Sequence, residues 1–202
     1  GNIIIDSKYS YAFEFSEGLA AVRENGLFGF VDRQGNMVIP PQFGSGSCFH
    51  DGRASVTVGG KDGYIDTMGR VVIEGPFDFN NDFSEGLAAV RINRKWQYID
   101  INGNIVIKNA DYLVGAPFVE GLARIEVEGK GEGFINKSGE IVIEPKYDVV
   151  EDFTEGYFAF GVGGEKDKYG RYKGGKWGYA DRQGNIVIPP IYDGAGPYKN
   201  GL

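Results

Sequence analysis

Short runs of apolar residues recur along the chain, separated by polar stretches that contain glycine. Three kinds of run follow one another in a fixed order. The first has the form Gly-Leu-Ala-x-Val (86–90), the second joins an aromatic residue to aliphatic ones (28–32), and the third is a triplet of aliphatic residues (105–107). No run has the ten or more periodic residues of a helix. The pattern therefore predicts three β-strands per unit and an all-β protein.

The runs belong to tandem repeats of about 34 residues. The stretch from Phe83 to Val90 returns almost unchanged at 15–22 and more loosely further along. Because such repeats bury their core against their neighbours, we treat 1–202 as one repeat array. Its predicted divisions are a partial repeat at 1–12, five repeats at about 13–46, 47–80, 81–115, 116–150 and 151–195, and the start of another at 196–202.

The third run of each unit, such as Ile105-Val106-Ile107, has no polar alternation and predicts a strand that is covered on both faces. A segment of the type Asp32-Arg33-Gln34-Gly35 precedes it. Aspartate favours the first position of a type I turn and glycine the fourth. The recurring acidic residues are therefore interpreted as turn residues rather than catalytic carboxylates.

One spacing is constant throughout. Six residues separate the aromatic after each aliphatic triplet from the aromatic that opens the next unit, as in Phe43 to Phe49 and Phe77 to Phe83. A fixed count indicates that this link passes through packed structure, where one extra residue would turn side chains to the wrong face. We expect these aromatics to form a stacked ladder between repeats.

Length varies mainly between the first and second strands. The fifth repeat carries about ten extra residues there, within 161–176, which are rich in glycine and locally basic. Insertions in repeat proteins often lie on the binding face. A flexible, solvated hairpin is the simpler interpretation, and a specific site is the alternative.

Composition and charge narrow the function classes. The net charge of −7 disfavours nucleic acid as a partner, although a local basic patch remains possible. The single cysteine, Cys48, forms no internal disulfide and leaves the compartment open. No apolar run reaches the roughly 20 residues of a membrane span.

The segment Trp177-Gly178-Tyr179-Ala180-Asp181, with Lys176 before it and the run to Pro190 after it, resembles the bacterial WG repeat, also called the KWG repeat. The likeness extends over essentially the whole chain. The tryptophan of the family is replaced by Phe28, Asp62 and Glu132 in three units. The resemblance implies a β-rich array without a general biochemical activity.

The units are shorter than typical propeller blades, which have about 40–45 residues and four strands. We therefore expect an open, twisting, β-solenoid-like stack cut from a longer parent chain. The alternative is a β-propeller-like ring of five or six blades.

The favoured function is a non-catalytic scaffold that binds a protein partner or the rest of its parent chain. The alternative is a carbohydrate or cell-wall binding module, suggested by the 12 Tyr, 14 Phe and 2 Trp. Because the tryptophan position accepts Asp62 and Glu132, it is predicted to face solvent. The candidate surface binding residues are Trp96, Trp177, Tyr169, Arg171 and Tyr172.

An enzyme is not expected, because the carboxylates recur as turn residues rather than as one distinct pair. The sequence contains no phosphate loop, metal-ligand cluster or nucleophile elbow. We assign no catalytic, cofactor-binding or metal residue and predict no cofactor. His50, the one histidine, is expected to be an exposed substitution.

Overall fold

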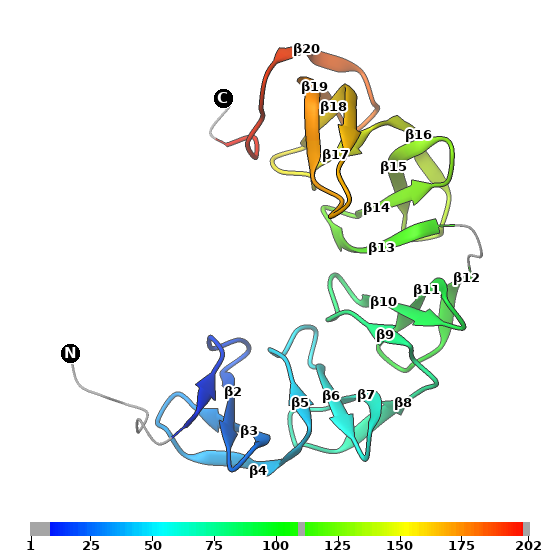
Figure 1. The fold of residues 1–202 in the computed structure, drawn as a ribbon. Coiled ribbons are helices and arrows are strands. Elements are labelled where there is room, and N and C mark those ends of the chain that lie inside the picture. The colour runs from blue at the N-terminus through cyan, green and yellow to red at the C-terminus, as the bar shows by residue number, and fades with distance from the viewer. Residues whose placement is uncertain (1–8, 109–111, 200–202) are drawn as a thin grey trace, which may run out of the picture. The chain divides into compact units, whose positions relative to one another are not determined.

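The described residues, 9–108 and 112–199, form twenty β-strands and no helix in this computed structural model (Figure 1). The strands make five antiparallel sheets of four strands each. The chain divides into two units, residues 1–106 and 107–202, and each is described by itself.

The sheets follow one another in chain order, and within each sheet consecutive strands are neighbours. The first three sheets begin in the first unit, and the last strand of the third sheet, β12, crosses the boundary between the units. The fourth and fifth sheets belong to the second unit. The strands are β1 Tyr11–Ala12, β2 Leu19–Glu24, β3 Leu27–Asp32, β4 Met37–Phe43; β5 Ser45–Gly46, β6 Ala54–Val58, β7 Lys61–Ile65, β8 Val71–Glu74; β9 Phe79–Asn80, β10 Leu87–Ile92, β11 Lys95–Asp100, β12 Ile105–Lys108; β13 Tyr112–Val119, β14 Leu122–Val127, β15 Gly131–Asn136, β16 Ile141–Tyr147; β17 Val149–Val150, β18 Tyr157–Lys166, β19 Tyr172–Asp181, β20 Ile186–Tyr192.

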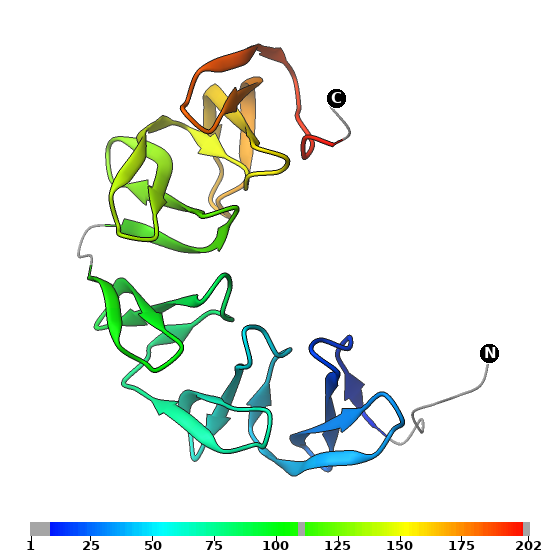
Figure 2. The same ribbon diagram turned by 180° about the vertical axis from the view of Figure 1, so that it is seen from behind.

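The three predicted strands are present in all five sheets, but three is not the full number. Each sheet also begins with a strand before its Glu-Gly or Asp-Gly turn, and four of these five strands have only two residues. Figure 2 shows β4 leading directly into β5, which then pairs with β6 through Ser45 opposite Thr57. The strand predicted at 3–5 lies outside the described residues, as do residues 200–202 of the repeat start predicted at 196–202. An open or ring-shaped array stays a prediction.

The aliphatic triplets are not covered on both faces, contrary to the sequence-based expectation. The third residue is buried in four sheets, as for Ile39 and Ile73, but the preceding residues are largely exposed. Val72 is 40% exposed and Val106 48% exposed. These triplets lie in the last strand of each sheet, which hydrogen-bonds to only one neighbour within its sheet. An edge strand leaves half of its backbone groups without a ladder partner.

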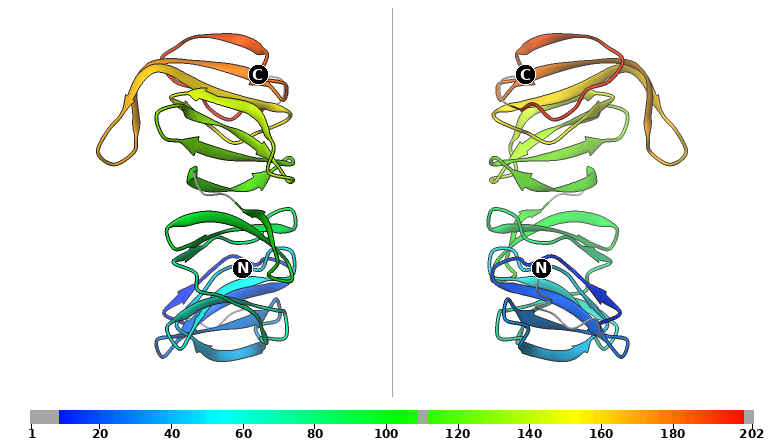
Figure 3. Two further views of the ribbon diagram at one scale, coloured as in Figure 1. Left: turned by 90° about the vertical axis from the view of Figure 1, so that its right-hand side faces the viewer. Right: turned by 90° about the vertical axis from the view of Figure 1, so that its left-hand side faces the viewer.

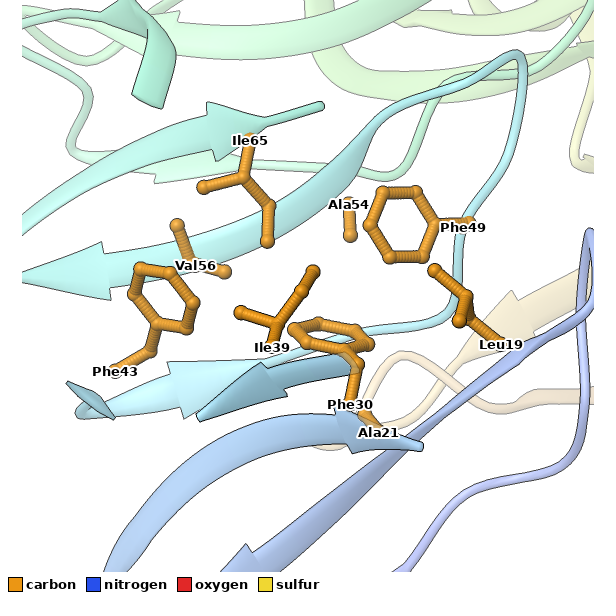
Figure 4. Close-up of a cluster of buried hydrophobic side chains, with 9 residues drawn as sticks. All are labelled: Leu19, Ala21, Phe30, Ile39, Phe43, Phe49, Ala54, Val56 and Ile65. Carbon is orange, nitrogen blue, oxygen red and sulfur yellow. The ribbon is translucent and has the colours of Figure 1, made fainter. Parts of the chain in front are cut away.

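Aromatic side chains join successive sheets, although not as the predicted ladder of paired aromatics. In the first unit, the Phe30 ring lies between Phe43 and Phe49, with centroid distances of 6.4 and 5.0 Å. Figure 4 shows these rings within one cluster that includes Ile39 from the first sheet and Ile65 from the second. The constant spacing therefore positions two aromatics around a third, which comes from the second strand of the predicted unit.

The same joint recurs at the next junctions. Phe83 lies 4.9 Å from Tyr64 in the first unit, and Phe153 lies 4.7 Å from Phe134 in the second. All four of these side chains are buried. The opening aromatics of the second, third and fifth sheets thus anchor each of these sheets to the one before it.

The Glu-Gly turns supply a second, polar joint between sheets. Glu17 and Gly18 both have positive φ, as a type I′ turn requires. Such a backbone is uncommon for glutamate. Its carboxylate accepts a hydrogen bond from the Gly52 amide of the next turn, at 2.9 Å. The same bond joins Asp51 to Gly86 at 2.7 Å and Glu120 to Gly156 at 2.9 Å.

The turns between the second and third predicted strands confirm the interpretation of their aspartates. The Asp32 carboxylate accepts hydrogen bonds from the amides of Gln34 and Asn36, at 2.9 and 2.8 Å. The Gly35 amide donates to the Asp32 carbonyl at 3.0 Å. The side-chain hydrogen bond from Asn36 lowers the pKa of Asp32. The hydrogen bonds of the turn therefore favour the ionised form of Asp32.

Candidate interaction site on the fifth sheet

The insertion of the fifth repeat is an ordered β-hairpin rather than a flexible loop. Strands β18 and β19 continue in unbroken register to the pair Lys166 and Tyr172. The two flanking strands end earlier. Strand β17 pairs with β18 no further than Gly161, which lies opposite Val149, and β20 pairs with β19 no further than Trp177, which lies opposite Tyr192. Figure 3 shows the far part of the hairpin standing clear of the other strands of its sheet. Below, "long hairpin" means residues 162–176.

Glycines in the long hairpin make room for one tyrosine ring. A Cβ atom on Gly164 would lie 2.4 Å from the Tyr172 ring, and one on Gly161 would lie 2.7 Å from it. A Cβ on Gly175 would meet the Tyr172 hydroxyl at 2.1 Å. Real Cβ atoms are never this close to their neighbours, so only glycine lets the ring lie across the strands. The glycines therefore leave the space that the Tyr172 side chain occupies.

The tip of the long hairpin repeats the aspartate turn of the other units. The Asp167 carboxylate accepts hydrogen bonds from the amides of Tyr169 and Arg171, at 2.9 and 3.0 Å. Its second oxygen pairs with the Arg171 guanidinium at 2.9 Å. Asp66 makes the same contacts with Met68 and Arg70. The insertion is thus closed by a turn that the chain already uses.

An ion cluster fastens the long hairpin to the fourth sheet, within the second unit. The Lys166 amine lies 2.8 Å from Glu126 and 2.6 Å from Glu132. The other Glu132 oxygen accepts a hydrogen bond from the Val150 amide at 2.8 Å. Although burial opposes protonation, the hydrogen bonds to the two glutamates raise the pKa of Lys166.

The prediction that the tryptophan position faces solvent is wrong for Glu132, whereas the other residues at this position are partly exposed: Phe28, Asp62, Trp96 and Trp177. The Glu132 side chain is only 6% exposed and is neutralised by Lys166. Asp62, at the same position in the second sheet, accepts a hydrogen bond from the Thr57 hydroxyl at 2.7 Å. At both positions a neighbouring side chain pairs with the carboxylate, and for the buried Glu132 this pairing offsets the cost of burial.

Beside the long hairpin lies a cavity of about 520 Å³. Arg124, Glu126 and Glu132 form one side, from β14 and β15, and the hairpin forms the other. Trp177 packs edge-on against Tyr172, with ring centroids 5.3 Å apart. The cavity therefore combines two aromatic rings with charged side chains of both signs.

The structure brings four of the five candidate binding residues together and leaves one apart. Arg171, Tyr172 and Trp177 line the cavity, and the guanidinium of Arg171 lies 5.1 Å from the centre of the Tyr169 ring. Tyr169 is 70% exposed, whereas Trp177 and Tyr172 are partly buried. Trp96 lies on β11 in the third sheet and packs against Phe79.

Sequence reasoning missed the polar half of this site: Arg124, Glu126, Glu132 and Lys166. The sequence did contain one signal for these residues. Glu132 replaces the family tryptophan in the fourth repeat, and the insertion follows in the fifth. Among residues 9–108 and 112–199, no group of three or more His, Cys, Asp and Glu side chains is arranged to hold a metal ion. Within the same ranges, no helix is long and apolar enough to cross a membrane.

Five successive four-stranded antiparallel sheets define an all-β protein of tandem repeats. The chain belongs to the family described as WG containing repeat, which is matched at residues 1–28, 28–61, 63–96, 98–130, 133–165 and 177–202. The family that the sequence resembles is therefore confirmed. Among curated proteins, none matches the chain.

Solved structures with similar folds have β-propeller-like repeats. The computationally designed Ika8 protein has a TM-score of 0.53 and 11% identity, over 86% of this chain and 59% of that one. BamB from Moraxella catarrhalis has a TM-score of 0.48 and 10% identity, over 86% of this chain and 58% of that one. The chain spans less than two thirds of both. At such low identity, the Ika8 likeness concerns the fold alone.

Proposed function

We propose that this chain is a non-catalytic scaffold that binds a protein partner through the long hairpin and the adjoining cavity. The observation that carries the proposal is the ordered hairpin itself. It extends beyond both of its neighbouring strands, yet a seated tyrosine, a hydrogen-bonded turn and an ion cluster hold its shape. A rigid projection reduces the ordering cost of binding.

The position of the hairpin also supports this proposal. The buried cluster of the second unit contains Phe153, Phe158 and Phe160, with Val162 packed at its border. Residues beyond Val162 add little to this core. A segment that costs backbone entropy without building the core is more typical of binding than of folding.

The second sheet provides the design for the test. There, Gly59-Gly60 joins Val58 to Lys61, and Val162 and Lys176 are paired in the same way. Replacing residues 163–175 by Gly-Gly recreates that short turn. Glu132→Gln is added so that no buried carboxylate loses its partner.

Wild-type and shortened proteins are compared as baits for protein capture, and the affinity of each captured protein is then measured with purified components. The proposal predicts that the specific partner binds the wild type and is lost from the shortened form, while both unfold cooperatively. Equal affinity of a partner for both proteins contradicts a role for the hairpin.

A glycan is the second candidate, because Tyr172 and Trp177 line a cavity that also contains carboxylates. Trp96→Phe leaves Trp177 as the only tryptophan, and Trp177→Phe leaves Trp96. A glycan in the cavity would change the fluorescence of the first variant and not of the second. No change in either across a glycan panel removes this candidate.

A further inference from the structure

Four side chains at the tip of the long hairpin form one continuous cluster. The Lys168 amine lies 4.8 Å from the centre of the Tyr169 ring, and the Arg171 guanidinium lies 5.1 Å from it. Lys173 and Arg171 share one Asp167 oxygen, at 3.2 and 2.9 Å. These contacts place two cations against an aromatic ring that is 70% exposed, and Asp167 holds a third cation, Lys173, beside Arg171. We call Lys168, Tyr169, Arg171 and Lys173 the tip cluster.

The charge of the hairpin region is opposite to that of the rest of the chain. Residues 161–176 hold five cations and two carboxylates, a net charge of +3. The remaining residues hold 16 cations and 26 carboxylates, a net charge of −10. The positive tip is therefore the part of this protein that attracts a negatively charged partner.

We propose that the tip cluster binds a short acidic segment of a protein partner, an inference that rests on the proposed function. Carboxylates pair with the three cations, and a neighbouring apolar or aromatic residue packs on Tyr169. Tyrosine and arginine are the residue types that most often dominate binding energy at protein interfaces. The partner segment carries only two or three carboxylates, because the cluster has three cations and Asp167 already neutralises part of their charge.

Internal ion pairs favour a peptide over a nucleic acid. Lys166 is held by Glu126 and Glu132, and Lys176 pairs with Asp193 at 2.6 Å. The cations on either side of the tip are thus occupied by the protein itself. A nucleic-acid backbone needs a longer track of available cations, and the surrounding negative charge opposes it.

The test measures binding of a labelled peptide of three glutamates and one tyrosine, at about 20 mM salt, where screening is weak. The first variant carries Lys168→Glu, Arg171→Glu and Lys173→Glu. The control carries Lys61→Glu, Lys95→Glu and Lys130→Glu, which reverse exposed lysines at the hairpins of the second, third and fourth sheets. Both variants change the net charge by the same amount, so only the location differs.

We expect the tip variant to bind the peptide about tenfold more weakly or worse, and the control to stay within about threefold of wild type. A milder variant, Lys168→Gln with Lys173→Gln, keeps the Arg171–Asp167 pair and should fall between them even if the triple variant disturbs the turn. A peptide with glutamine in place of glutamate should bind none of the proteins.

Equal weakening in both triple variants, or no binding by wild type, overturns the inference. Tighter binding of a six-nucleotide single strand through the same residues also overturns it and makes the tip a nucleic-acid site. The proposed function would remain supported after any of these outcomes, provided that shortening the hairpin still abolishes partner binding. Conversely, unchanged partner binding after shortening removes the proposed function whatever the peptide does.

Discussion

The second and fifth sheets are built from the same repeat and differ most in one hairpin. In the second, Gly59-Gly60 joins β6 to β7, whereas residues 163–175 fill the equivalent place in the fifth. Both sheets nevertheless bury their opening aromatic against the preceding sheet, through Phe49 and Phe153. The joint between sheets is therefore independent of hairpin length. The repeat can gain a longer hairpin and still keep this joint, although its core changes from Ala54 and Val56 in the second sheet to Phe158 and Phe160 in the fifth.

The strongest test of this independence removes the joint from both sheets. Phe49→Ala and Phe153→Ala each leave a cavity among buried side chains and should cost about 3–5 kcal/mol of the free energy of unfolding. Chemical denaturation measures both. If Phe153→Ala costs much less than Phe49→Ala, the fifth sheet is not anchored as the second is, and the comparison fails.

The regular parts of this fold were predictable because each follows from a local rule. Glycine and aspartate mark the turn at Asp32–Gly35, and the constant six-residue spacing marks the joint at Phe43–Phe49. The two-residue first strand, such as β5, gave no signal, because pairing with β6 defines it rather than its own residue pattern. The exposure of Val72 was missed because an apolar triplet does not reveal that its strand lies at an edge.

The candidate site was predictable on its hairpin side only. Arg171, Tyr172 and Trp177 are close in sequence, so the insertion pointed to them. Glu132 lies 34 residues from Lys166, and its role depends on a contact between two sheets. Glu132 in place of tryptophan therefore indicates a binding site only when it is considered together with the insertion in the following repeat.

The second prediction concerns the lysines of the two hairpins. Lys166→Met leaves the buried Glu132 without its ion-pair partner and should cost about 1–3 kcal/mol. Lys61→Met, on the exposed short hairpin, should stay within about 0.5 kcal/mol of wild type. Equilibrium unfolding of both variants measures the difference. Similar values for the two would show that the ion cluster does not fasten the long hairpin.

A double-mutant cycle and a pH series sharpen this result. Glu132→Gln should be less costly in the Lys166→Met background than in wild type, because the buried charge is then gone. The folded-state pKa of Lys166 is raised above its ordinary value of 10.5. Its stabilising effect is therefore fully present below that value and is lost as the pH rises through the folded-state pKa. Lys166→Met should abolish this alkaline loss.

The third prediction concerns the seat of Tyr172. Gly164→Ala places a methyl group 2.4 Å from the ring and should displace it, with a cost of about 1–2 kcal/mol. Gly44→Ala is the matched control in the first unit, because its new methyl group meets Thr57 at an ordinary 3.6 Å. Near-ultraviolet circular dichroism and thermal unfolding report the change. If the two substitutions are equivalent, the glycines of the long hairpin do not hold the ring.

The smallest effect separates two turns that look alike. Asp66 and Asp167 make the same hydrogen bonds, but Asp66 lies beside the core of its sheet and Asp167 lies at the tip of the long hairpin. Desolvation opposes the ionised form of both carboxyl groups, but their hydrogen bonds lower both pKa values below the ordinary value of 3.8. The stability that each ionised carboxylate contributes is therefore present above pH 3.8 and is lost as the pH falls through its folded-state pKa.

Asp66→Asn should lower the unfolding temperature slightly, by less than Phe49→Ala, Lys166→Met or Gly164→Ala. Asp167→Asn should leave it unchanged, because the tip opens without the rest of the sheet. The second change would instead appear as faster hydrogen exchange confined to the turn at residues 167–171. If Asp167→Asn lowered the global unfolding temperature, the turn at the tip would be part of the cooperative core, and its independence from the rest of the sheet would be wrong.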